Sequence, residues 1–208
     1  MEKDYKIYIK DQLSSITTEE LEAAIASLPA CRKEKALRFK HRQGRIECTF
    51  SYLLLCQALR EVYGITEQPS FLIGEHGKPE LAFPSNLKSQ ISNLKPICFN
   101  LSHCKQALAV ALSTSPVGID VESVGRYSES LARHVLNDSE FAAVTQSPNP
   151  QIPFTRLWTQ KEAVVKLTGR GIDDDLPNLL LKYNNVSLHT EEHLAQGYIL
   201  SVATYKNS

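Results

Sequence analysis

Two acidic residues in a short apolar run are the first candidates for chemistry in this sequence. The run is VGIDVE, which spans residues 117–122 and carries Asp120 and Glu122. In a β-strand, side chains two positions apart share a face, so these carboxylates would lie together while Ile119 and Val121 point to the buried side. Mg²⁺ typically takes one or two carboxylates together with substrate phosphates, so the pair predicts a metal site. A solvated strand face accounts for the same residues equally well.

The second candidate is the segment WTQKEAVVK, residues 158–166. In a helix, Trp158, Glu162 and Lys166 would line one stripe, because residues at i and i+4 are neighbours on a helix surface. Glu162 and Lys166 also fit an ordinary ion pair, which contributes only about 0.3–0.5 kcal/mol, and a lone tryptophan fits a core position. The functional interpretation is that Glu162 joins the two strand carboxylates as a third metal ligand.

Ser102 and His103 follow the apolar run at residues 97–101 and would lie at a strand end. Adjacent residues of an extended chain point to opposite faces, so His103 is not expected to serve as the base for a Ser102 nucleophile. Ligation of a phosphate is the preferred interpretation of this pair. Lys78 lies in the turn-like segment GEHGKP, which lacks the Ser or Thr that follows the lysine in a P-loop.

Basic residues gather in residues 32–45, where Glu34 is the only acid. They are Arg32, Lys33, Lys35, Arg38, Lys40, Arg42 and Arg45. Arg38, Arg42 and Arg45 are spaced i, i+4, i+7 and would form one cationic face if a helix continued through them. A solubilising helix face normally mixes both signs of charge. The single sign therefore predicts an anionic ligand or partner.

The composition is that of a soluble globular protein with one domain or two small halves. Of the 208 residues 42% are hydrophobic and 22% are charged, and 23 basic residues balance 23 acidic ones. This balance excludes a bulk attraction to nucleic acid or to an anionic membrane. The first ten residues are too polar for a signal peptide, and five cysteines without CxxC spacing predict free thiols, so we expect a cytoplasmic protein.

The elements that must position these residues alternate between strands and helices. Strands are expected at residues 5–9, 70–73, 97–101, 107–112, 117–121, 179–183 and 198–204, and helices at residues 17–28, 32–45, 46–63, 128–144 and 154–167. The order strand, helices, strands occurs twice. It predicts an α/β (α+β) protein of two similar halves, residues 1–114 and 115–208.

Taken together, these segments resemble the Sfp-like 4'-phosphopantetheinyl transferases. The matching segments are RKEKALRFK, HGKPEL, FNLSHC, VGIDVE, LNDSEF and LWTQKEAVVKLTGRGI, in that order. The resemblance implies the 4'-phosphopantetheinyl transferase fold, in which two similar α/β halves are related by pseudo-twofold symmetry within a monomer. It also implies an enzyme that transfers 4'-phosphopantetheine from coenzyme A to a serine of an apo acyl or peptidyl carrier protein, releasing 3',5'-ADP.

The same resemblance implies a role for each candidate residue. Mg²⁺, or Mn²⁺ in its place, would be held by Asp120, Glu122 and Glu162. Glu162 would also act as the general base for the carrier serine, directly or through a water molecule, and Lys166 would stabilise or protonate the leaving phosphate. Coenzyme A would be bound by Lys35, Arg45, Lys78, Ser102, His103 and Lys166, with Arg42 as the alternative to Arg45 at the 3'-phosphate. Supporting roles fall to Glu140, Trp158 and Lys161.

The residues themselves leave two other functions open. A metal-dependent nuclease, or another phosphotransferase, would also use Asp120, Glu122 and Glu162, although a nuclease would require a broader basic groove than this neutral chain predicts. A non-catalytic protein that binds coenzyme A or a carrier would have no need of Glu162 and Lys166. The sequence does not distinguish a fatty-acid carrier from a polyketide or peptide-synthetase carrier.

Overall fold

A computed structural model describes residues 4–74, 79–82, 96–125, 127–169, 171 and 175–206. Before residue 114 the elements are β1 (Tyr5–Lys10), η1 (Leu13–Ser15), α1 (Thr18–Ala26), α2 (Ala30–Arg38), α3 (Arg42–Tyr63), β2 (Ser70–Ile73), β3 (Pro79–Ala82), β4 (Cys98–His103) and β5 (Leu108–Ser113). After it come β6 (Val117–Ser123), α5 (Glu129–Val135), α6 (Asp138–Thr145), α7 (Gln151–Thr168), η3 (Leu176–Asn178), α8 (Leu179–Lys182), β7 (Val186–His193) and β8 (Tyr198–Tyr205).

The two parts of the chain repeat one topology. The first sheet has the order β1-β5-β4 and the second has the order β6-β8-β7, and all of these neighbours are antiparallel. In each part, helices follow the first strand, and the last strand of the part lies in the middle of its sheet. The chain passes from one sheet to the other between β5 and β6, at residues 114–116. The expected α/β fold of two similar halves is therefore confirmed.

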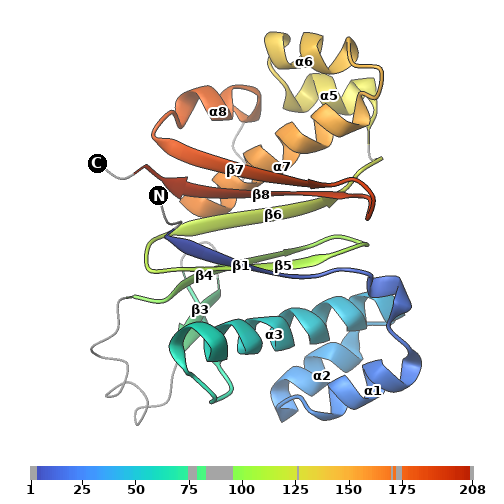
Figure 1. Ribbon diagram of the computed structural model, residues 1–208, viewed down its shortest axis with the longest axis vertical. Coiled ribbons are helices and arrows are strands. Elements are labelled where there is room, and N and C mark those ends of the chain that lie inside the picture. The colour runs from blue at the N-terminus through green and yellow to red at the C-terminus, as the bar shows by residue number, and fades with distance from the viewer. Residues whose placement is uncertain are drawn as a thin grey trace.

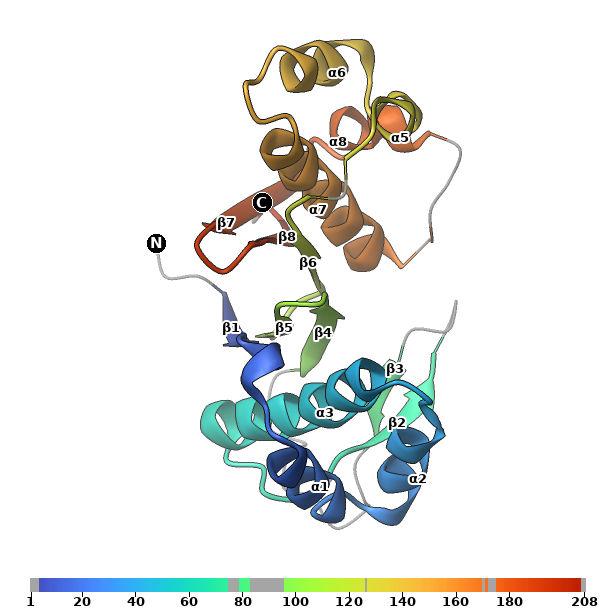
Figure 2. The ribbon, with the colours of Figure 1, turned by 90° about the vertical axis from the view of Figure 1, so that its right-hand side faces the viewer.

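The two sheets form the centre of the molecule, and helices cover their outer sides (Figure 1). Figure 2 shows α3 on the outer side of the first sheet and α7 on the outer side of the second. Alternation along β5 explains this arrangement, because successive side chains of a strand point to opposite faces. Leu108 and Val110 pack with α3, whereas Ala109 and Ala111 pack against Ile119 and other apolar residues of the second sheet.

The contact between the sheets is mostly apolar, with one polar link. Ile7 of β1, Val121 of β6 and Val202 of β8 belong to the cluster of apolar side chains that fills the space between the sheets. Within it, the Asn100 side-chain oxygen of β4 accepts a hydrogen bond from the backbone N–H of Ile119 at 3.0 Å. This bond pairs a polar group that burial would otherwise leave unsatisfied.

The expectation of one helix through residues 32–45 is wrong. The helix α2 ends at Arg38 and α3 begins at Arg42, because Phe39 and His41 have extended backbones. The Phe39 ring packs on Gly44, where a Cβ atom would lie only 2.6 Å from the ring. Arg38 therefore does not continue a cationic helix face with the arginines of α3.

Three further differences concern the second half and the β2–β3 hairpin. The expected helix at residues 128–144 is two helices, because both Ser128 and Asn137 cap a helix N-terminus. The expected strand at residues 179–183 is the helix α8, since a short apolar run such as LLL fits either element. The strands β3 and β7 were not predicted, and β7 is rich in charged and polar residues. Among the residues described, no helix is long and apolar enough to cross a membrane.

Candidate active site

Close packing between β6 and α7 brings the predicted carboxylates to one place. Gly118 makes this packing possible, because a Cβ atom at this position would lie 2.0 Å from the backbone oxygen of Ala163 in α7. Asp120 lies on the same face of β6 as Gly118, and it is only 4% exposed. For Asp120, the interpretation as a solvated strand face is therefore wrong.

Asp120 forms a buried polar cluster with one residue from β4 and one from α7. The Ser102 hydroxyl donates to Asp120 Oδ1 at 2.8 Å, and Lys166 Nζ donates to the same oxygen at 2.7 Å. Lys166 Nζ also donates to Ser102 Oγ at 2.8 Å. The second carboxylate oxygen, Asp120 Oδ2, is buried and has no hydrogen-bond partner. An unpaired buried carboxylate oxygen is costly, so this atom is suited to bind a cation.

Glu162 lies close enough to interact electrostatically with both of the other predicted carboxylates, Asp120 and Glu122. Burial raises the pKa of Glu162, and the Asp120 carboxylate raises this pKa further, whereas Lys166 lowers it and Glu122 adds to the rise. Glu122 accepts a hydrogen bond from Trp158 Nε1 at 3.3 Å. The indole and the three carboxylates thus belong to one neighbourhood on β6 and α7.

The carboxylate oxygens near Asp120 fit a divalent cation whose remaining ligands come from a bound substrate. Among the described residues, no three acidic, histidine or cysteine groups already form a complete metal cluster. Instead, Lys166 balances the charge of Asp120 directly. One or two carboxylates and the phosphates of a substrate are sufficient for Mg²⁺, and the unpaired Asp120 Oδ2 is an oxygen of the required kind.

A pocket of about 290 Å³ lies between α2, α3 and the strands β2 and β4; we call it the α3 pocket. Its lining includes Arg32, Lys35, Glu47, Ser51, Tyr52, Phe71 and His103. Lys35 and His103 were both predicted to bind coenzyme A, and the structure brings them to this one pocket. Arg32 was noted only as part of the basic run, and the two aromatic residues were missed.

Arg32 is built into the wall of the α3 pocket. Its guanidinium lies over the ring of Tyr52, 4.8 Å from the centroid, and 5.5 Å from that of Phe71. Its Nε atom and the hydroxyl of the buried Ser51 have no hydrogen-bond partner. Two unpaired polar groups next to aromatic rings suit a ligand that is both aromatic and polar.

Arg45 and Arg42 do not join the α3 pocket. Both line a separate groove between α1 and α2. Arg45 Nε donates to the backbone oxygen of Phe39 at 2.9 Å, and Arg42 donates to the backbone oxygen of Ile16. Lys78 lies outside the described residues.

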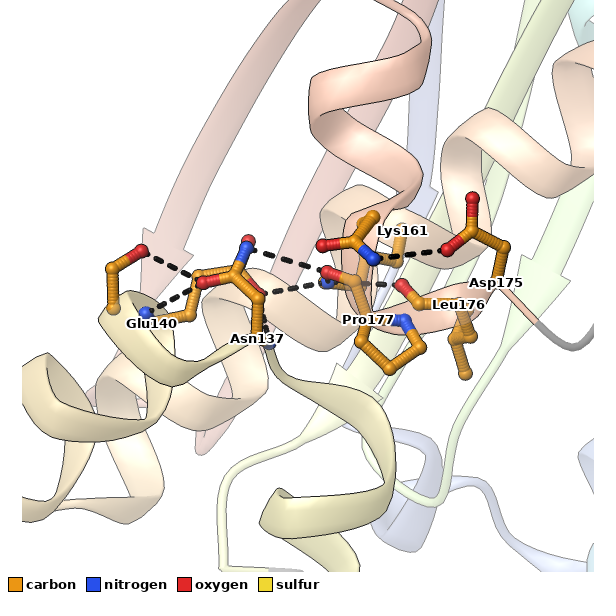
Figure 3. Close-up of polar contacts among 8 residues, drawn as sticks. Asn137, Glu140, Lys161, Asp175, Leu176 and Pro177 are labelled. Carbon is orange, nitrogen blue, oxygen red and sulfur yellow. Dashed lines mark hydrogen bonds and ion pairs between the residues drawn. The ribbon is translucent and has the colours of Figure 1, made fainter.

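A buried ion pair anchors α7 on a further side (Figure 3). Lys161 is fully buried, and its Nζ lies 2.8 Å from Glu140 Oε2. The same Nζ donates to the backbone oxygens of Leu176 at 3.0 Å and Pro177 at 2.7 Å. Burial lowers the pKa of Lys161, and Glu140 opposes that change. Glu140 also completes the capping box of α6 with Asn137, so its carboxylate connects α6 to α7, and Lys161 connects α7 to η3.

Comparisons with known proteins identify the family of this chain. A family model for the 4'-phosphopantetheinyl transferase superfamily matches residues 116–202. A 4'-phosphopantetheinyl transferase of Bacillus subtilis is 26% identical over 199 residues, which cover 94% of this chain and 83% of that protein. The transferase AcpT of Salmonella typhimurium is 35% identical over 169 residues, or 75% of this chain and 80% of AcpT. The chain therefore belongs to the 4'-phosphopantetheinyl transferase superfamily and is a phosphopantetheinyl transferase.

Proposed function

We propose that this enzyme transfers 4'-phosphopantetheine from coenzyme A to a serine hydroxyl of an apo acyl or peptidyl carrier protein, with Mg²⁺ or Mn²⁺, releasing 3',5'-ADP. The observation that carries the proposal is the cluster of Ser102, Asp120 and Lys166, in which one buried carboxylate oxygen lacks a partner. The cluster lies where β4 of the first half meets β6 and α7 of the second. Such a junction suits a phosphate-containing substrate that contacts both halves.

The α3 pocket supports binding of the nucleotide end of coenzyme A. Arg32, Lys35 and His103 would contact phosphate groups, and the partly exposed Phe71 ring would pack against the adenine. The buried Tyr52 ring would support the Arg32 guanidinium from below. The N-terminal half, residues 1–114, would thus supply most nucleotide contacts. The C-terminal half, residues 115–208, would supply the carboxylates and the helix α7. One chain offers both parts, so we propose a monomer.

Asp120, Glu122 and Glu162 would hold the metal ion. When bound, Mg²⁺ supplies charge neutralisation at the pyrophosphate and polarises the phosphorus that is attacked. Lys166 lies 2.7 Å from Asp120 and is 28% exposed, so its ammonium would also face a phosphate bound at this place. A lysine beside a developing phosphate charge stabilises the transition state more than the ground state.

Glu162 is the proposed general base. Burial raises its pKa, which brings the carboxylate closer to the basicity that proton transfer near neutral pH requires. The carrier serine oxygen would form a bond to the β-phosphorus of coenzyme A as its proton passes to Glu162. The bond from that phosphorus to the bridging oxygen of 3',5'-ADP would break, and Lys166 would donate a hydrogen bond to the departing phosphate.

The relatives support transfer rather than hydrolysis of nucleic acid. A protein of Saccharomyces cerevisiae named L-aminoadipate-semialdehyde dehydrogenase-phosphopantetheinyl transferase is 28% identical over 200 residues, which are 89% of this chain and 69% of that protein.

All five cysteines are free thiols, which is in keeping with the cytoplasmic location that we propose.

Mass spectrometry of apo carrier proteins, incubated with the enzyme, coenzyme A and Mg²⁺, tests the proposal. We expect one phosphopantetheine unit to be added at the carrier serine, and carriers of fatty-acid, polyketide and peptide synthesis are to be compared. The Glu162→Gln variant should lose transfer while it still binds 3',5'-ADP. Glu61→Gln, which removes the same charge from an exposed position of α3, should transfer like the wild type. Full transfer by Glu162→Gln would contradict the assigned base.

A further inference from the structure

An acidic residue lies in a pocket that we assign to an anion. Glu47 of α3 lines the α3 pocket together with Arg32, Lys35 and His103. Of the described residues that line this pocket, Glu47 alone carries a carboxylate. Its side chain is 20% exposed, so it is partly withdrawn from solvent and only incompletely screened from a bound ligand. The pocket thus combines attraction for phosphate with a local repulsion.

Contacts on both oxygens hold the Glu47 carboxylate in place. Its Oε1 accepts a hydrogen bond from Gln43 Nε2 at 2.9 Å, and its Oε2 lies 3.5 Å from His103 Nδ1. Because Gln43 is one helical turn before Glu47, this contact favours the observed side-chain direction. Glu47 would therefore give up two polar contacts if it turned away from a ligand.

The arginines that were expected at the 3'-phosphate do not offset this carboxylate. Arg45 donates to the backbone oxygen of Phe39, Arg42 donates to that of Ile16, and both line the groove between α1 and α2. The cations of the α3 pocket among the described residues are Arg32, Lys35 and, when protonated, His103. Glu47 cancels part of their charge within the pocket itself.

We propose that Glu47 is a specificity-determining residue, which weakens binding of the 3'-phosphate of coenzyme A and so lets the pocket accept a 3'-hydroxyl nucleotide almost as well. The inference rests on the proposed binding of the nucleotide in the α3 pocket. A phosphate monoester carries roughly −1.5 to −2 charges at neutral pH, whereas a ribose hydroxyl carries none and can donate a hydrogen bond to a carboxylate. The repulsion therefore acts on the phosphorylated form.

Binding of 3',5'-ADP and of 5'-AMP by isothermal titration calorimetry tests this inference without carrier or metal. Removing a unit charge at a distance of several ångströms from a doubly charged phosphate should change affinity by about fivefold to tenfold at low salt. We therefore expect Glu47→Gln to tighten 3',5'-ADP by that factor and to change 5'-AMP by less than about twofold. The difference should shrink at high salt, because screening acts on the charge and not on the fold.

Glu34→Gln is the matched control, because Glu34 is exposed on α2 and does not line the pocket. It removes the same charge from the same basic segment and should leave the ratio of the two affinities unchanged. Glu47→Ala is a second variant, expected to raise the preference for 3',5'-ADP like Glu47→Gln, and thermal unfolding reports whether each variant is folded.

The outcomes separate this inference from the proposed function. An unchanged ratio in folded Glu47→Gln, or a loss of affinity for both nucleotides, would overturn the role of Glu47, and the second result would indicate that Glu47 only positions His103. If wild-type enzyme binds neither nucleotide but still modifies a carrier, the assignment of the α3 pocket is wrong and this inference is wrong with it. Absence of both binding and transfer would overturn the proposed function as well.

Discussion

Replacing Gly118 by alanine should damage the site through the position of α7. The added Cβ would lie 2.0 Å from the backbone oxygen of Ala163 and 2.5 Å from the backbone nitrogen of Leu167, whereas Cβ atoms essentially never come within 3.0 Å of such neighbours. Neither contact is a flexible side chain, so α7 must move away from β6 by about 1 Å. Overpacking of this kind costs about 1–3 kcal/mol of unfolding free energy, and a 1 Å misplacement of reacting groups costs roughly 100-fold in rate.

The assay measures kcat for modification of an apo carrier, with urea unfolding as the measure of stability. Leu59→Ala is the control, because Leu59 is 1% exposed in the core of the first half and does not line the α3 pocket. It should cost about 2–5 kcal/mol and leave kcat per folded molecule close to that of the wild type. A folded Gly118→Ala protein with kcat within threefold of the wild type would refute the argument that close packing at Gly118 positions α7.

Three further predictions concern buried polar groups. Ser102→Ala should lower the unfolding free energy by about 1 kcal/mol, measured with urea, because Lys166 still pairs with Asp120; a loss above about 3 kcal/mol would contradict this. Lys161→Met leaves the partly buried Glu140 without its cation and should cost about 3 kcal/mol, as measured by urea unfolding. Without Mg²⁺, the midpoint of thermal unfolding of wild-type protein should fall relative to Glu162→Gln as the pH rises from about 4.5. The sign follows because burial raises the pKa of Glu162 in the folded protein above its value in the unfolded chain. The protonated carboxyl therefore favours the folded state at low pH, and this contribution to stability is lost as the pH rises through the folded-state pKa. Parallel pH profiles for the two proteins would refute the prediction.

Local sequence patterns predicted the elements that position the carboxylates. Alternation in VGIDVE placed Asp120 and Glu122 on one face of a strand, and β6 is that strand. The helix expected from residue 17 is α1, and the Thr17 side chain caps it in a capping box with Glu20. The helix expected to end at residue 63 is α3, and Gly64 ends it in a left-handed conformation with φ of 67°. Strand alternation and helix caps depend on residues that are close together in the chain, so they can be predicted from the sequence alone.

Contacts between distant segments were beyond such patterns. The bonds of Ser102 and Lys166 to Asp120 join residues 18 and 46 positions apart in the chain. Their formation depends on how two sheets and α7 pack, which no local periodicity encodes. The same reason explains why the basic run did not form one cationic helix face as expected. The helix is interrupted between Arg38 and Arg42, so Lys35 lines the α3 pocket whereas Arg45 lines another groove. Even a correct list of cations does not determine which of them share a ligand.

Contacts with the sheet and with residues 175–178 hold α7 in place. On the side of α7 that faces the sheet, Gly118 admits close contact with β6, and the buried Thr159 hydroxyl lies 2.8 Å from that of Ser201 in the neighbouring strand β8. Lys161 attaches the helix to the segment at residues 175–178 through two backbone oxygens. Because catalytic groups must be held within about 0.5 Å of their working geometry, these contacts to the sheet and to residues 175–178 would hold Glu162, the proposed base, near Asp120. Burial and the negative charge of Asp120 both raise the pKa of Glu162, so the position of α7 would set the basicity of this carboxylate.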